Sequence, residues 1–268
     1  MDKIHFETRK EVVAIAIGLL KRQTGSRFST VDFLTSHFYI VEHLYSGYKQ
    51  EQIALNCGMI LREVFKFNVL TEMLFSCAWF WNIFEYAKLP EFHVSSDAFA
   101  TLREVLVRDK SISSVFIQAN YDKFLVHLNE FLQSEDYVLK RQTLKLIGEL
   151  VSDKQCYEFS QAFLASQENL KNVMNFMRDK SKNIAMEAYF LFKLFVLNPR
   201  RKAGISGILF KNKAKIISFL EGVVSQEKAE DEEFTAENSK CIQVVQGIEP
   251  KKAEAAAGEE PDQFSDCE

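Results

Sequence analysis

Four segments of the chain, each thirteen residues long, can be aligned with one another without gaps. They are Ile53–Phe65, Val94–Leu106, Val138–Leu150 and Ile184–Val196, and their starts are 41, 44 and 46 residues apart. A helical segment that recurs every ~40–47 residues is typical of armadillo and HEAT repeats. Each such repeat has to stack on its neighbours to bury its apolar face, and the stack forms an extended binding surface. The spacing therefore predicts a protein that binds other proteins, rather than a fold built around one active site.

The aligned positions indicate which face of each helix is buried. The first, ninth and thirteenth positions fall on nearly the same face, because a helix makes one turn every 3.6 residues. These positions are apolar in all four segments: Ile53, Val94, Val138 and Ile184, then Leu61, Leu102, Leu146 and Phe192, then Phe65, Leu106, Leu150 and Val196. The fifth position is small in three segments, but the third segment has Gln142 there. The alternative is a bundle of four unrelated amphipathic helices, which would not require a constant spacing.

The composition favours an all-α fold. The chain has 268 residues, of which 47% are hydrophobic, but only four prolines and ten glycines, and it has no alternating strand pattern. We expect a right-handed α-α superhelix of armadillo/HEAT-like repeats over residues 1–248, followed by a disordered acidic tail over residues 249–268. The helices are expected near residues 7–22, 29–45, 49–66, 69–86, 95–108, 111–133, 135–152, 155–165, 168–178, 183–197, 201–210 and 212–224, with one more possible over 234–248.

Charge is distributed unevenly along the chain. From Val223 onward there are 13 acidic residues and four lysines, a net charge of −9, whereas the whole chain carries −4, so residues 1–222 carry +5. A mildly basic body fits acidic protein partners. Nucleic acid is not expected as a partner, because this charge is small and no RGG, aromatic-basic or zinc-finger pattern is present. A general helical-repeat adaptor for transport cargo or nucleic acid remains the alternative function.

The sequence contains no pattern that predicts an enzyme, a cofactor, a small-molecule substrate or a membrane span. GxSxG, P-loop, GxGxxG and SxxK motifs are missing. His37 and His43 lie ~240° apart on a helix, so that they cannot share a metal ion. The five cysteines are odd in number and irregularly spaced, which favours a reducing, cytoplasmic location. The longest apolar stretch is much shorter than the ~18–20 residues that cross a bilayer.

Four longer stretches, EQIALNCGMILRE, SSDAFATLREVL, EDYVLKRQTLKLIGEL and ENLKNVMNFMRDKSKNI, closely resemble the Mo25-like family of scaffold proteins. The resemblance extends from about Lys10 to Gln246. It implies an armadillo-like fold without catalytic activity that binds a protein kinase or pseudokinase. In the family the partners are the STRAD pseudokinase, with which the liver kinase tumour suppressor is activated, and germinal-centre kinases. Fungal Hym-type relatives act with NDR-type kinases in polarised growth. Some members are named calcium-binding proteins, but this sequence offers no calcium-ligand cage.

The resemblance also implies a peptide-binding pocket formed by Tyr137, Arg141, Lys145 and Met174. In the family, the matching positions help to bind a Trp-Glu-Phe tripeptide at the pseudokinase C-terminus. The residue types suit this ligand, because arginine and lysine pair with carboxylates and methionine adapts to aromatic rings. The alternative for the same residues is a solvated basic stripe and a core methionine.

A second set of residues matches the kinase-facing surface of the family: Phe92, Lys154, Tyr157, Lys211 and Lys215. Two of them depart from the family pattern, since Lys154 stands where arginine is usual and Tyr157 where phenylalanine is usual. A lysine cannot make the two parallel hydrogen bonds of an arginine fork, so two-pronged contacts with a partner are expected to be lost at this position.

The chain begins almost at the segment KEVVAIAIGLLKRQTGSR, whereas the family has further helices before it. About the first quarter of the family pattern is therefore expected to be lacking. We expect an exposed apolar end formed by six residues, Val12, Val13, Ile15, Ile17, Leu19 and Leu20. A fragment, a covered end and a naturally short member all remain open.

Overall fold

The computed structural model describes residues 3–227 and 232–249 of the chain. The chain divides into two compact units, Met1–Phe159 and Ser160–Glu268. In the described residues every regular element is helical, apart from one bridge between Thr24 and Arg27. The predicted all-α fold of helical repeats is therefore confirmed. The expected disordered tail lies outside the described residues, except for Glu249, and stays a prediction.

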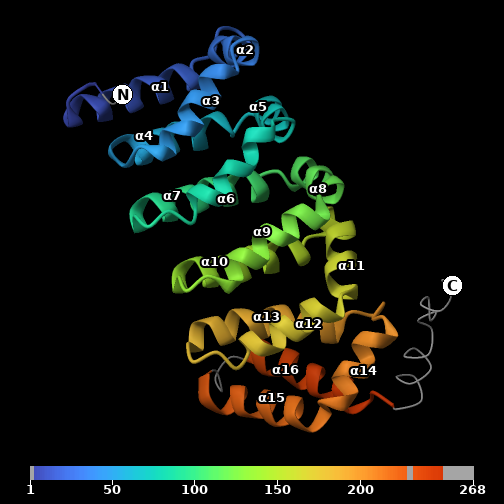
Figure 1. Cartoon of the computed structure of the whole chain (residues 1–268). Helices are drawn as coiled ribbons and strands as arrows, with labels where there is room; N and C mark the ends of the chain where they lie inside the picture. The colour runs from blue at the N-terminus through green and yellow to red at the C-terminus, as the bar shows by residue number, and fades with distance from the viewer. Residues whose placement is uncertain (1–2, 228–231, 250–268) are drawn as a thin grey trace, which may run out of the picture. The chain divides into compact units, whose positions relative to one another are not determined.

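The first unit contains the first three repeated segments. Its helices are α1 (Phe6–Lys21), α2 (Ser29–Ser36), α3 (Tyr39–Ser46), η1 (Gly47–Lys49), α4 (Glu51–Val64), α5 (Asn68–Phe75), η2 (Ala78–Trp81), α6 (Asn82–Tyr86), α7 (Phe92–Val107), α8 (Lys110–Ala119), α9 (Tyr121–Gln133), α10 (Tyr137–Val151), η3 (Lys154–Cys156) and the first turn of α11 (Tyr157–Ala165). The repeated segments form α4, α7 and α10, which lie one below the other in Figure 1, and α7 contacts both of the others.

The second unit contains the fourth repeated segment. Its helices are the rest of α11, α12 (Gln167–Phe176), α13 (Lys182–Leu197), α14 (Ala203–Lys211), α15 (Lys213–Glu227) and α16 (Glu232–Gln246). The fourth segment forms α13, which packs against α12 and α16, and α15 packs beside α16 (Figure 1). A buried polar chain joins three of these helices: Tyr189 Oη donates to Asn238 Oδ1 at 2.9 Å, and Asn238 Nδ2 donates to the Leu220 carbonyl at 2.8 Å.

The aligned apolar positions form the core of the repeats, as expected. Eleven of the twelve are buried, and Val138 alone is half-buried. In the first turns of α10 the buried face has moved on by one residue, because Leu139 and Thr143 are buried while Gln142 is exposed. From Leu146 onward, the aligned apolar positions of this segment are buried again. The third repeat therefore turns part of its aligned face away from the core.

Three of the expected helices are interrupted, since 29–45, 69–86 and 111–133 each form two or more helical pieces. The third break shows the local cause. Asn120 Nδ2 donates to the Phe116 carbonyl at 2.9 Å and closes the end of α8, while the Asn120 carbonyl accepts from Phe124 N–H and begins α9. An asparagine side chain that satisfies a terminal carbonyl in this way competes with continuation of the helix. The first break falls at His37. The second falls at Cys77, and the backbone of Cys77 is extended.

The tenth position of the repeat carries a cation that pairs with an acid on another helix. Arg62 contacts Asp97 at 2.8 Å, and Arg103 contacts Glu149 at 2.7 Å. Lys193, at the same position of the fourth segment, pairs with Glu237. The third segment again departs, with the buried Ile147 at this position. Polar contacts between neighbouring helices thus accompany the apolar repeat.

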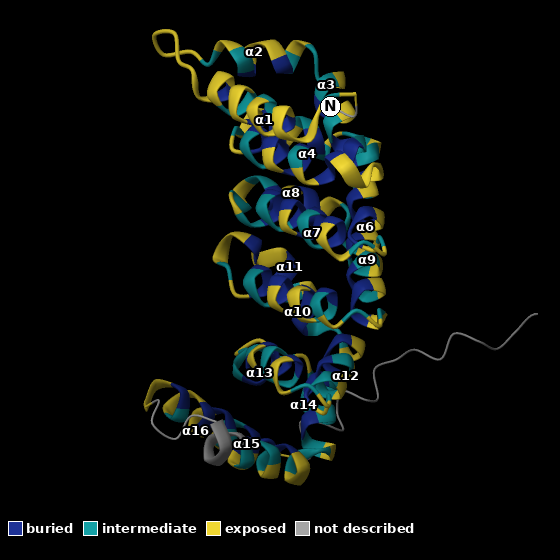
Figure 2. Cartoon of the chain, turned by 90° about the vertical axis from the view of Figure 1, so that its left-hand side faces the viewer, coloured by how far each residue is buried: buried dark blue, intermediate teal, exposed yellow. Residues whose placement is uncertain are grey.

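The first helix is less exposed than its sequence predicts. It packs against α4, and this contact buries Val13 and Leu20. The expectation of exposure is wrong for these two residues because they face α4. It is confirmed for Ile15, which is 62% exposed, and for Leu19, and exposed positions along α1 are visible in Figure 2.

Candidate functional site

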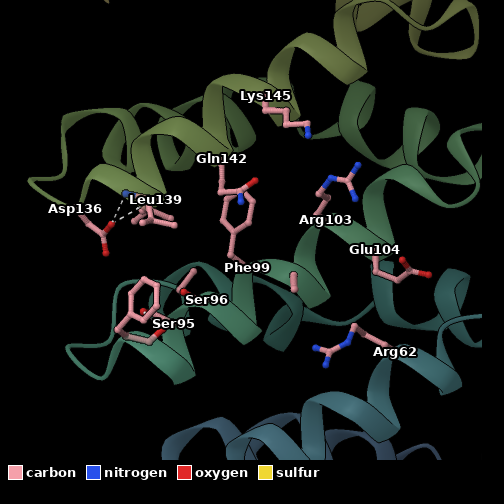
Figure 3. A pocket seen from close by; sticks show the side chains of 14 residues that line it. Arg62, Ser95, Ser96, Phe99, Arg103, Glu104, Asp136, Leu139, Gln142 and Lys145 are labelled. Carbon is pink, nitrogen blue, oxygen red and sulfur yellow. Dashed lines mark hydrogen bonds between the residues drawn. The ribbon is translucent and has the colours of Figure 1, made fainter. Parts of the chain in front are cut away.

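A groove of about 650 Å³ lies between α7 and α10 of the first unit (Figure 3). Phe92 and Phe99 line it from α7, whereas Leu139, Gln142 and Lys145 line it from α10. Phe92 is the first residue of α7 and is 60% exposed, so a large apolar ring is open to a ligand. An exposed aromatic ring beside a groove is the usual form of an anchor point for a protein partner.

The groove follows from the altered third repeat. The helices α4 and α7 pack along much of their length, but α7 meets α10 over fewer positions. At the fifth position of the repeat, Cys57 and Ala98 are small and buried, while the longer Gln142 is exposed. In Figure 3, Gln142 and Phe99 face each other from the two helices. A polar side chain here favours an open, wetted gap instead of close helix contact.

The charges that line the groove differ in their availability. Arg103 makes a two-pronged contact with Glu149, with Nε–Oε2 and Nη2–Oε1 distances of 3.1 and 2.7 Å, so its guanidinium is already paired. Lys145 is exposed and has no acidic partner within the described part of the chain. Lys145 is therefore the cation on this side that an incoming carboxylate would meet.

A buried polar cluster fixes α7 against α4 beneath the groove. Arg62 Nη2 donates to Asp97 Oδ1 at 2.8 Å, and Tyr48 Oη donates to Asp97 Oδ2 at 2.8 Å. Thr101 Oγ1 lies 2.7 Å from Tyr48 Oη and 2.9 Å from Arg62 Nη1. Burial raises the pKa of Tyr48 well above its usual range, so the phenol keeps its proton and donates. The fully bonded cluster makes one wall of the groove rigid.

A second hollow lies in the second unit, where α12, α14 and α15 meet around Met174. We call it the methionine pocket. One part, of about 380 Å³, is lined by Met174, Lys171, Arg178 and Lys211; an adjoining part of about 40 Å³ adds Met177, Lys215, Ile216 and Phe219. The smaller part has mainly apolar walls, whereas Gln167, Asn175 and Asn212 also line the larger part, and the cations lie around both. Met174 is half-buried, which leaves its flexible thioether accessible to a ligand.

The predicted site residues fall into separate groups. Phe92 and Lys145 are brought together in the groove, whereas Tyr137 and Arg141 lie exposed on α10 outside its lining. Lys154 and Tyr157 are also exposed, on η3 and α11, and line neither hollow.

In the second unit, Met174, Lys211 and Lys215 come together around the methionine pocket. Because Met174 belongs to a different unit from Tyr137, Arg141 and Lys145, the peptide pocket formed by all four residues stays a prediction.

Several lining residues were not predicted. The signal for the groove was Gln142, which breaks the small-residue position of the repeat. The signal for the methionine pocket was partly helical spacing: Lys171 lies three residues before Met174 and so shares its face of α12. Arg178 follows just after the end of this helix and also lines the pocket. Nothing in the sequence predicted that Phe99 lines the groove, because its place there depends on how far α7 and α10 separate.

The described residues offer little for metal binding or nucleophilic chemistry. Ligand atoms of Glu85, His127 and Glu130 lie within 4.8 Å of one another, but Lys88 Nζ is 2.8 Å from Glu85 and 2.9 Å from Glu130. The ammonium group thus already provides the positive charge at this cluster. Burial raises the pKa of Cys57 to about 11, which leaves the thiol protonated and unreactive at neutral pH.

Comparison with known proteins agrees with the repeat architecture. The sequence profile described as Mo25-like matches residues 1–249. The chain belongs to the Mo25-like family. The calcium-binding protein 39-like protein of Mus musculus is 40% identical over 94% of this chain and 74% of its own length. The Mo25-like protein of Schizosaccharomyces pombe is 37% identical, with 92% and 75% covered.

Two further matches widen the comparison. The conidiophore development protein hymA of Emericella nidulans is 30% identical to this Mo25-like chain over 94% of the chain and 74% of its own length. The crystal structure of an engineered protein has a TM-score of 0.51 at 12% identity, covering 91% of this chain and 92% of that one. At that identity the likeness concerns the fold alone. Within the described residues, no helix is both long and apolar enough to cross a membrane.

Proposed function

We propose that this Mo25-like protein is a non-catalytic, cytoplasmic scaffold that binds a protein kinase or pseudokinase and favours its active conformation. The observation that carries the proposal is the groove between α7 and α10, where the exposed ring of Phe92 and the exposed ammonium of Lys145 lie on opposite walls. Family membership supports the same role. STRAD-type, germinal-centre and NDR-type kinases are the partner classes that the family resemblance suggests.

The activation mechanism is a shift of populations in the partner. A scaffold that contacts the active arrangement of a kinase better than the inactive one moves the equilibrium by the difference in affinity. A difference of about 100-fold corresponds to about 2.7 kcal/mol, which is within reach of a few well-placed contacts. No proton transfer or bond cleavage by the scaffold is needed.

A second part of the proposal concerns a partner peptide that ends in aromatic and acidic residues. We assign its recognition to Tyr137, Arg141, Lys145 and Met174, and the contacts with the kinase itself to Lys154, Tyr157, Lys211 and Lys215. The exposure of Arg141 and Lys145 and the accessible thioether of Met174 support this assignment. Cations would hold the carboxylates, and methionine would contact the rings.

The test is titration of the full chain with a labelled peptide that ends in Trp-Glu-Phe. Met174→Ala and Arg141→Ala should each weaken binding by at least ~10-fold, as expected for residues at the centre of a contact. Met186→Ala is the matched control, since Met186 is a half-buried methionine of α13 that lines neither part of the methionine pocket. Unchanged affinity in both test variants would refute the pocket. Steeply salt-dependent binding to RNA, without kinase binding, would favour the general adaptor instead.

A further inference from the structure

The methionine pocket has an excess of positive charge that the described residues do not balance. Lys171, Arg178, Lys211 and Lys215 surround it, and all four are exposed. None of them has an acidic partner among the side chains that the structure describes, those of residues 3–222 and 232–249. Most other cations that line a hollow or connect helices here do have one, as Arg62 and Arg103 show. Four cations without an acidic partner, around a hollow in which Met174 and Phe219 are accessible apolar side chains, suit an acidic segment that carries an aromatic ring.

The chain itself contains such a segment. Residues 249–268 include seven acidic side chains and two lysines, a net charge of −5. Phe264 is the single aromatic residue among them, and it stands between Asp262 and Asp266 in the stretch PDQFSDCE. This segment is complementary to the pocket, because its acids can pair with the cations and its aromatic ring can contact Met174.

The segment also leaves the fold close to the pocket. Lys213, the first residue of α15, donates its Nζ to the carbonyls of Gln246 and Ile248, the latter at 3.4 Å. Lys213 lies two residues from both Lys211 and Lys215 on the pocket rim. The fifteen Cα–Cα steps from Glu249 to Phe264 span at most ~50 Å. The pocket residues of α15 lie within its first two turns, about 9 Å along the helix, so the segment can reach the pocket easily.

We propose that the acidic segment after Glu249 docks on the methionine pocket of its own chain, with Phe264 against Met174 and the flanking acids on the cationic rim. A tethered segment acts at an effective concentration in the millimolar range, so a weak contact is sufficient. Bound there, the segment excludes a partner peptide from Met174 and makes the scaffold self-inhibited. The exclusion rests on the proposed function, whereas the docking does not.

The docking is tested on the full chain by NMR of its methionine methyl groups. An aromatic ring in contact shifts a methyl resonance, so Phe264→Ala should move the Met174 and Met177 signals and leave those of Met59 and Met73 in place. Those two methionines belong to the first unit and lie outside the pocket. Gln263→Ala is the matched control in the segment and should move no signal. A Met174 signal that is unchanged by Phe264→Ala would overturn the proposal.

Two further measurements test the charge contacts and ask whether the segment binds its own chain or a second copy. The double variant Asp262→Asn with Asp266→Asn should reproduce the Phe264→Ala spectrum, as should added salt, because the rim contacts are screened. The wild-type shift should be independent of protein concentration. A shift that grows with concentration would assign the segment to a second copy and overturn the intramolecular proposal.

The inhibitory effect is measured with the Trp-Glu-Phe peptide. The affinity of Phe264→Ala for this peptide should exceed that of wild type by ~10-fold, since the pocket is free for a larger fraction of the time. Equal affinities together with a Phe264-dependent methyl shift would overturn the inhibition. If the peptide bound neither protein, the proposed function would fail, and the methyl signals would still decide the docking.

Discussion

Gly58 of α4 leaves space for the buried polar cluster beneath the groove. A methyl group on its Cα would lie 1.8 Å from Asp97 Oδ2 and 2.5 Å from Tyr48 Oη. Neither group can move away without breaking hydrogen bonds to the other or to Arg62. Gly58→Ala should therefore lower the free energy of unfolding by about 3 kcal/mol, through overpacking and lost hydrogen bonds.

Urea denaturation of Gly58→Ala and of Gly148→Ala measures this loss of unfolding free energy. Gly148→Ala is the control, because a Cβ on Gly148 in α10 would meet no atom within 4 Å. In a helix interior that change should stabilise by about 0.5–1 kcal/mol. Equal effects of the two substitutions would contradict the proposed role of Gly58.

His127 should make stability depend on pH. Burial against Phe84 and Trp81 lowers its pKa, and Glu130, with an oxygen 3.6 Å away, opposes this only in part. The unfolded chain then binds the proton more readily than the folded chain, so stability falls as pH decreases from about 6.5. Replacing the ring by phenylalanine keeps the stacking and removes the titration.

The comparison is made between pH 7 and pH 5, above the range in which most carboxylates titrate. His127→Phe should lose less free energy of unfolding over this interval than wild type. An identical loss in wild type and His127→Phe would rule out the effect.

Among the helices, the cation at the tenth repeat position contributes different amounts to the free energy of unfolding in different repeats. Arg62 and Asp97 have side chains that are 26% and 15% exposed, and Tyr48 adds a hydrogen bond to the same carboxylate. The Arg103 side chain is 41% exposed. Arg62→Met leaves a largely buried acid without its cation and should cost about 2 kcal/mol, whereas Arg103→Met should cost less than about 1 kcal/mol.

Chemical denaturation of the two methionine variants side by side tests this ranking. In the sequence the two arginines occupy equivalent positions and would be expected to contribute equally. A larger loss for Arg103→Met than for Arg62→Met would show that burial does not set the strength of these pairs.

For the whole molecule, the sequence was sufficient for the architecture and insufficient for the sites. The apolar positions recur at a fixed spacing, so Leu61 and its equivalents identified the buried faces correctly. The break at Asn120 was not predicted, because it depends on a side chain that bonds to the Phe116 carbonyl only once the preceding helix exists. The groove depends on how far α7 and α10 separate, which periodicity does not encode. Gln142 was a visible irregularity whose meaning required the structure.

We propose that this Mo25-like protein activates a kinase by binding it, without chemistry of its own. The most direct measurement is the activity of a purified STRAD-type pseudokinase–kinase pair as the full chain is added. We predict saturable activation, with the half-maximal concentration raised at least ~10-fold by Phe92→Ala or Met174→Ala and unchanged by Met186→Ala. Activation that is missing altogether, or that is unaffected by both test substitutions, would contradict the account.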